Sequence, residues 1–220
     1  MAATTWDALK DKKSELIRKA LEGSVFVADI SATAISTLTT TGAALNALPA
    51  GYEDLGQISK DGLSWGRSVD ISDVTSWGAT EPTRSDVTKD VTTLKCVAQE
   101  TKLLTIGLHT GADVSAVVGT IATGEVAIAK PAISASRYYR VLAISVDIGD
   151  GGEIYIARYL PRAKIVDYAE QKWSDGDDPI QYDLTWQSFV DSTLGYSEKY
   201  YWGGPGWLAL LDEMGIEIDT

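Results

Sequence analysis

A serine between two glycines is the first candidate for chemistry in this sequence. The run Gly62-Leu63-Ser64-Trp65-Gly66 has the G-x-S-x-G spacing of a nucleophile elbow. That motif needs the serine on a sharp strand-to-helix turn, with a histidine and a carboxylate following in the chain. Here the residues after Ser64 alternate as in a strand, and a fold of repeated strand-helix units is not indicated. A glycine-flanked hairpin is therefore favoured over a hydrolase.

The only histidine limits acid-base and metal chemistry. A catalytic triad, a two-histidine metal site or a histidine base would all have to use His109. This residue falls at the end of a predicted short helix, where a partly charged imidazole would complement the helix dipole. Phosphate-binding glycine motifs are absent from the sequence. We expect no catalytic residue, no cofactor and no metal.

Two acidic clusters, residues 147–153 and 175–178, could supply oxygen ligands to calcium. Neither matches the twelve-residue calcium loop, and Asp and Gly are the usual residues of tight turns.

Five aromatic residues near the C-terminus could form a sugar-binding platform or a buried subunit interface: Tyr196, Tyr200, Tyr201, Trp202 and Trp207. The single cysteine, Cys96, is expected to be a small core residue.

Charge and hydropathy exclude several classes of protein. The 19 basic and 31 acidic side chains give a net charge of −12, and residues 167–220 hold 12 acids and 2 bases of this total. Such a field repels phosphate backbones, so a tight nucleic-acid reader is disfavoured. No apolar run reaches the roughly 20 residues that span a bilayer, and no signal peptide is indicated. A soluble product, made in the cytoplasm, is expected.

The elements that would position these residues are mostly strands. Residues 5–22 have apolar side chains at helical spacing and predict an amphipathic helix, which Gly23 ends. Two short strands, residues 25–30 and 34–40, and a connector would complete an arm over residues 1–51. Residues 52–220 would then form the main domain.

In this main domain, Asp61-Gly62 predicts a tight hairpin between strands at residues 55–59 and 63–71. Residues 72–89 lack periodicity and predict a long loop. A strand at 87–99, a short helix at 101–109 and a strand at 125–129 follow. The last elements are strands at 137–148, 153–160, 163–173 and 180–190, and one or two helical turns at 207–214.

Three segments, taken in order, resemble the major tail proteins of long-tailed bacteriophages. They are residues 54–63 (DLGQISKDGL), residues 74–78 (VTSWG) and residues 91–96 (VTTLKC). The resemblance covers about residues 52–110, and residues 111–200 follow only by strand pattern. It implies a mainly β fold, a β-sandwich or half-barrel of about eight strands with a short flanking helix, in addition to the N-terminal helical arm. Contractile tail tubes and type VI secretion tubes share this shape.

The resemblance also implies a role. Members of this family form stacked rings, usually hexamers, around a tape-measure protein, meet tail terminator and baseplate proteins, and later pass double-stranded DNA. The chain would be a structural component of the virion tail, assembled in the host cytoplasm, with no membrane partner. A carbohydrate-binding or adhesion module is the alternative, and a hydrolase is the third possibility.

Two sets of residues are candidates for assembly and transport. The loop at 72–89 is expected to contact a neighbouring subunit or ring, because long mixed-charge loops are usually functional. The hairpin at 137–160 is expected to line the channel, because it is long, turns tightly and carries polar residues on a face that a simple core would not need. An acidic wall there would repel phosphates and let DNA slide past. The proposed contact residues are Asp73, Trp77, Glu81, Arg84, Asp86 and Lys89, and the proposed channel residues are Asp147, Asp150 and Glu153.

Overall fold

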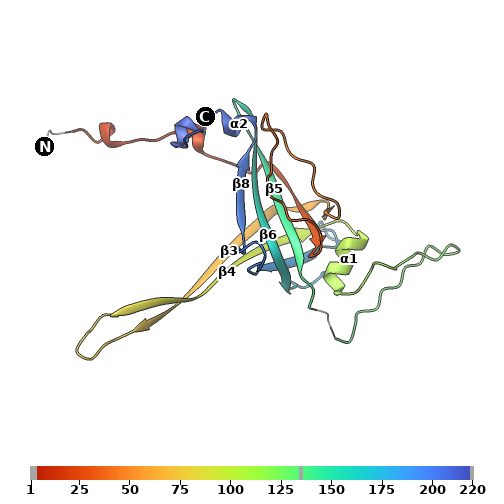
Figure 1. Ribbon diagram of the computed structural model, residues 1–220. Helices are drawn as coiled ribbons and strands as arrows, with labels where there is room; N and C mark the ends of the chain where they lie inside the picture. The colour runs from red at the N-terminus through yellow and green to blue at the C-terminus, as the bar shows by residue number, and fades with distance from the viewer. Residues whose placement is uncertain (1–3, 134–135, 219–220) are drawn as a thin grey trace.

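One antiparallel sheet organises the computed structural model, which describes residues 4–133 and 136–218 (Figure 1). Its order is β2-β1-β5-β6-β7-β4-β3, and β8 also pairs with β6. The strands are β1 (Glu22–Asp29), β2 (Glu53–Asp54), β3 (Ile58–Val74), β4 (Arg84–Ala98), β5 (Tyr139–Gly149), β6 (Gly152–Asp167), β7 (Tyr182–Ser188) and β8 (Lys199–Gly203). The prediction of a mainly β fold with about eight strands is confirmed.

The long strand β6 divides one of its edges between two partners. Residues Tyr155 to Tyr159 pair with β8, whereas Ala163 to Asp167 pair with β7. Both partners therefore follow one another along the same edge, and the sheet bends around the core from there. The other edge of β6 pairs with β5 along nearly its whole length.

Both faces of β5 and β6 are buried, because the alternating residues of each strand enter different apolar clusters. Val141 and Ala143 pack with Leu94, Trp186 and other residues of β1, β4, β6 and β7 and helix α1 (Leu103–Thr110). Leu142 and Tyr159 pack on the opposite face with Ile35 and Leu38, which precede β2. Each fully buried side chain of this size contributes roughly 1.5–3 kcal/mol. Cys96 is buried in the first cluster, as predicted, and burial raises the pKa of its thiol to about 12.

The predicted helix at residues 5–22 is wrong. The segment holds only the 3₁₀ turns η1 (Asp7–Leu9) and η2 (Ser14–Leu16), and Glu22 already begins β1. Gly23, expected to stop the helix, pairs with Ser145 of β5. The sheet thus begins inside residues 1–51, the segment that the sequence assigns to an arm. The physical reason is that a short helix is marginal in water unless its apolar face packs against another surface, and the described chain offers residues 5–22 no such surface.

The predicted tight hairpin at Lys60-Asp61-Gly62 is also wrong, because these residues lie inside the single strand β3. Ile58 pairs with Ala98 and Leu63 with Cys96, so β3 uses three more residues than β4 across this interval. The excess is accommodated as a bulge, in which Gly62 adopts a φ of 70°. An Asp-Gly pair suits a bulge as well as a turn, since both need a positive φ.

Half of the predicted loop at residues 72–89 is strand. β3 continues to Val74 and β4 begins at Arg84, so only residues 75–83 are irregular. Figure 1 shows the resulting hairpin projecting far from the rest of the sheet.

Other boundaries differ less. The short helix is confirmed as α1, which ends at Gly111 with a φ of 68°. The strands expected at 153–160 and 163–173 form one strand, β6, while 34–40 and 125–129 are not strands. β8 was not expected, and the last helical turns are α2 (Pro205–Leu208) and η3 (Asp212–Met214). Among the described residues, none of the helices is long and apolar enough to cross a membrane.

Candidate functional site

The projecting part of the β3–β4 hairpin, residues 66–92, has no third strand beside it. β4 pairs with β7 only from Thr93 to Ala98, and β3 pairs with β4 alone. Both edges of this distal ribbon therefore present backbone donors and acceptors that no strand of the described chain satisfies. Open strand edges are templates for pairing with another chain, and two-stranded ribbons are marginal by themselves.

Ion pairs fasten the two strands of the distal ribbon to one another. The Arg67 guanidinium donates to both carboxylate oxygens of Asp90, at 2.8 and 2.6 Å. Lys89 Nζ lies 3.7 Å from Asp70 on the other strand. The hydrogen bond from Arg67 holds the pKa of Asp90 below its ordinary value. The two ion pairs neutralise charge along the ribbon and keep its cross-strand register.

An apolar stripe runs along the distal ribbon without anything covering it. Val69 and Ile71 alternate along β3, and Val87 is the cross-strand partner of Ile71. All three side chains are exposed, and on the same face the Arg67–Asp90 pair separates them from Trp65 and Leu94 nearer the core. An exposed apolar row bordered by ion pairs is typical of a surface that a partner covers.

The structure places all six predicted contact residues on the distal ribbon, with Lys89 midway along it and the other five toward its end. Asp73 accepts a hydrogen bond from the Ser85 hydroxyl at 2.6 Å, Arg84 binds Asp86, and Lys89 faces Asp70. Trp77 and Glu81 lie in the irregular turn, and the Trp77 side chain is fully exposed. The surface is therefore a two-stranded ribbon with an aromatic tip, part of which the sequence pattern predicted as a loop.

The three predicted channel residues lie at the β5–β6 turn but differ in exposure. Asp147 is only 6% exposed. Its carboxylate lies 3.4 Å from the Arg18 guanidinium and accepts the Lys19 backbone N–H at 3.2 Å. Asp150 is exposed in the turn, and exposed Glu153 accepts the hydroxyl of Tyr155. Only Asp150 and Glu153 present their charge to solvent in the isolated chain.

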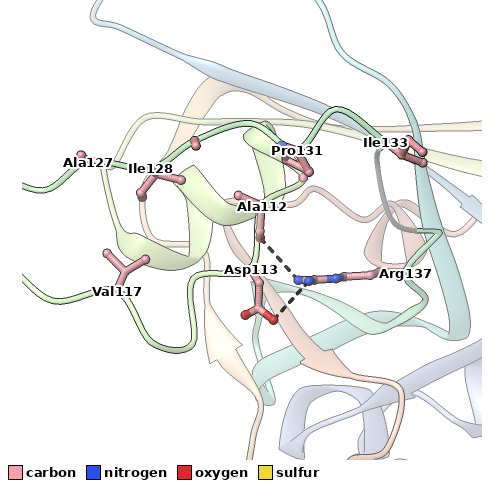
Figure 2. Close-up of a pocket in the computed structure, with 10 residues that line it drawn as sticks. Ala112, Asp113, Val117, Ala127, Ile128, Pro131, Ile133 and Arg137 are labelled. Carbon is pink, nitrogen blue, oxygen red and sulfur yellow. Dashed lines mark hydrogen bonds and ion pairs between the residues drawn. The ribbon is translucent and has the colours of Figure 1, made fainter.

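A small hollow of about 300 Å³ lies behind α1 in the segment leading to β5 (Figure 2). Arg137 closes one side, pairing with Asp113 at 3.3 Å and donating to the Ala112 carbonyl at 3.4 Å. The Ser115 hydroxyl and backbone N–H, then Arg137, lower the pKa of Asp113. The other lining residues are apolar or small: Gly111, Val117, Ala127, Ile128, Ala129, Pro131 and Ile133. Among the described residues that line the hollow, none is a nucleophile.

The candidate catalytic residues occupy structural positions. Ser64 lies within β3 opposite Lys95, so the sharp turn that a nucleophile elbow requires is not formed there. His109 contacts the ring edges of Tyr168 and Tyr182, with centroids 5.8 and 5.5 Å away. Burial, with a smaller effect of Lys130, lowers its pKa. The lowered pKa weakens the stabilisation that a charged imidazole was expected to give at the helix end.

The two acidic turns do not gather into a cation site. Across residues 4–133 and 136–218, no three His, Cys, Asp or Glu side chains come close enough to hold a metal. Residues 175–178 form an exposed bend between β6 and β7.

The C-terminal aromatic residues divide between the core and the surface. The Tyr201 side chain is buried, and its hydroxyl donates to the Ile35 carbonyl at 2.8 Å. Tyr200, Trp202 and Trp207 stack in a row, with successive centroids 5.7 and 6.0 Å apart. About half of the Tyr200 and Trp202 surface is exposed.

An arginine that the sequence did not single out holds the inner end of this row. The Arg158 guanidinium lies 3.7 Å from the centroid of Trp65 and 4.6 Å from that of Tyr200. It also binds Glu198 and donates to the Tyr200 hydroxyl at 2.8 Å. Arg158 thereby joins β3, β6 and β8, a convergence that spacing in the sequence does not signal.

Comparisons with known proteins assign the chain to a family. A search of curated protein sequences finds no match. A solved structure described as the crystal structure of Hcp protein is similar over 82% of this chain and 100% of its own chain, with 9% sequence identity and a TM-score of 0.31. The family model described as phage tail tube protein matches residues 11–187. Because that match spans most of the chain, the protein belongs to the phage tail tube protein family.

Proposed function

We propose that copies of this chain self-assemble into stacked hexameric rings that form a phage tail tube and conduct double-stranded DNA. The distal ribbon is the observation that carries the proposal. It has two open edges, an exposed apolar stripe and an aromatic tip, and it extends away from the core that stabilises the rest of the sheet. A neighbouring copy that covers the ribbon would satisfy its edges and bury its stripe.

The charge of the chain supports a conduit. A net charge of −12 makes nonspecific retention of a polyanion unfavourable. We assign Asp150 and Glu153 to the channel wall, because both are exposed at the β5–β6 turn. Asp147 would join them only where its pairing with Arg18 is released.

The partners proposed from family membership are further copies of the chain, the tape-measure protein, and terminator and baseplate proteins. DNA would pass without specific binding. The tube would be assembled in the host cytoplasm and act in the virion.

The direct test is negative-stain electron microscopy of the purified protein over a range of concentrations. Rings or tubes of uniform diameter are the expected result, and light scattering should rise with concentration. A protein that stays monomeric at every concentration would contradict the proposal.

A carbohydrate-binding module is the second candidate, because the exposed stack of Tyr200, Trp202 and Trp207 offers flat rings to a sugar. A monomer that binds glycans, and loses this binding when Trp202 is replaced by Ala, would favour it over the tube.

Replacing Asp150 by Lys is expected to slow DNA release from phage at low salt and much less at high salt. The change adds a cation at one position in every subunit, and the affinity of cations for DNA phosphates falls with salt. Release rates of phage with tails of normal length provide the measurement. The control is Asp175→Lys, which makes the same charge change in the exposed β6–β7 loop. Equal release by Asp150→Lys, Asp175→Lys and wild type would remove Asp150 from the channel.

A further inference from the structure

The N-terminal arm, residues 4–21, touches the remainder of the chain through few polar contacts. Arg18 and the Lys19 backbone bind Asp147, and the Leu21 N–H donates to the Val146 carbonyl at 2.9 Å. Farther out, Lys13 Nζ lies 2.7 Å from a carboxylate oxygen of Glu213. The arm is therefore anchored at residues 18–21 and leads from there past the C-terminal residues, away from the sheet (Figure 1).

The apolar residues of the arm have no partner within the described chain that buries them. Trp6, Leu9 and Ile17 are 71%, 66% and 78% exposed. Yet their spacing, with Leu16 and Leu21, is that of an amphipathic helix. Such a segment gains a helix only when its apolar face is buried, because nucleation is costly and propensity alone is marginal over this length. The sequence is thus suited to a helical state that the isolated chain does not adopt.

A surface of complementary character lies at the other end of the chain. We define the C-terminal surface as Tyr200, Trp202, Trp207, Leu208 and Glu213. Its aromatic row is stacked and half exposed, and Leu208 is exposed beside it. Without Glu198, which is paired with Arg158, residues 199–218 contain three acids and one base, for a charge of −2, whereas residues 4–21 contain five bases and three acids, for a charge of +2. The arm and the C-terminal surface therefore both expose apolar groups, and their net charges have opposite signs.

We infer that the arm of one copy folds into a helix on the C-terminal surface of a second copy. The Lys13–Glu213 pair already shows one charged contact of this kind within a chain, but it buries none of the arm's large apolar side chains. Exchange with a second copy would keep this charge pairing and cover the apolar face. This inference rests on the proposed self-assembly and adds a second contact, distinct from the distal ribbon.

The arm and the C-terminal surface are different patches, so the contact is heterologous and passes from copy to copy. Each copy would donate one arm and accept another. The arm would thereby add to ring closure or ring stacking without any change in the sheet.

The test uses two complementary full-length variants. Leu9→Asp spoils the arm but leaves the C-terminal surface intact, and Trp202→Lys places a repelling cation on the surface but leaves the arm intact. Each is expected to weaken self-association by about tenfold or more, the cost of a lost apolar contact. Ile121→Asp, at a fully exposed position in the segment between α1 and β5, is the matched control.

Mixing the two variants gives the decisive result. At concentrations below tube formation, sedimentation velocity should show heterodimers, and far-ultraviolet circular dichroism should show more helix than the sum of the separate samples. Dimers or added helix absent from the mixture would overturn the inference, as would assembly of both variants equal to that of Ile121→Asp. Helix present in dilute wild-type monomer but lost in Leu9→Asp would place the docking within one chain and also overturn it. Wild-type protein that forms no tubes would contradict the proposed function. The inference about the arm would still be decided by whether the mixture forms heterodimers.

Discussion

Replacing residues 73–85 by Asn-Gly is expected to give a folded monomer that no longer forms tubes. Ser72 and Asp86 are cross-strand partners, so a two-residue turn can join them without changing the register below. The residues removed contribute none of the side chains in either apolar cluster. Stability should therefore change little, whereas the aromatic tip and the end of the open edges are lost.

The measurements are thermal unfolding of the monomer and electron microscopy at a concentration where the wild type assembles. Point variants sharpen the result: Trp77→Ala is expected to raise the critical concentration for assembly. Trp173→Ala, an equal truncation of another exposed tryptophan, should leave it unchanged. Tubes of normal length and yield from the Asn-Gly variant would show that the ribbon tip makes no assembly contact.

The central strands could be predicted because local and global preferences agree there. β5 is rich in apolar and β-branched residues, and Asp150-Gly151-Gly152 turns the chain into β6. The burial of both faces of β5 and β6 could be predicted from the sequence only in part. Covering the second face depends on residues 31–52 returning over the sheet, and no local pattern shows that return.

The errors share a physical cause, which is that a local signal has more than one outcome. Asp61-Gly62 supplies a positive φ, and the distant partner β4 decides that it forms a bulge within a strand. Residues 5–22 carry a helical stripe, and the lack of a covering surface leaves them extended. In both cases long-range packing overrides propensity.

That the segment around Trp77 contacts a neighbouring copy stays a prediction, whereas its place in the fold is now described. The mixed-charge segment around Trp77 was expected to make contacts, and the structure places it at the end of a projecting ribbon. The strand character of residues 72–74 and 84–86 was hidden because these outermost residues are nearly all polar and show no alternation of apolar and polar side chains. Arg158, which joins three strands through Trp65, Tyr200 and Glu198, had no signal in the sequence.

Replacing Arg140 by Met is expected to destabilise the monomer more than any other single change proposed for it. The Arg140 guanidinium lies mostly buried behind β5, 3.3 Å from the Asp191 carboxylate. It also donates to the Tyr159 hydroxyl and to three backbone carbonyls, those of Ile30, Ala32 and Pro161. Its loss leaves a buried carboxylate without its cation and several acceptors without a donor, which costs about 3–5 kcal/mol.

The pH dependence of that loss identifies its origin. Burial alone would raise the pKa of Asp191, but the backbone N–H groups of Thr193 and Leu194, together with Arg140, lower it overall. A carboxylate with a lowered folded pKa stabilises the protein above its unfolded pKa of about 4, and this stabilisation disappears as the pH falls through the folded value. Urea unfolding followed by tryptophan fluorescence should therefore show a large difference between wild type and Arg140→Met at pH 7 and a smaller one at pH 3. Arg67→Met, which breaks the exposed pair with Asp90, is the control and should change stability little, because exposed pairs are screened by solvent. A difference for Arg140→Met that stays the same at both pH values would mean that the carbonyl contacts, and not the pairing with Asp191, account for the stabilisation.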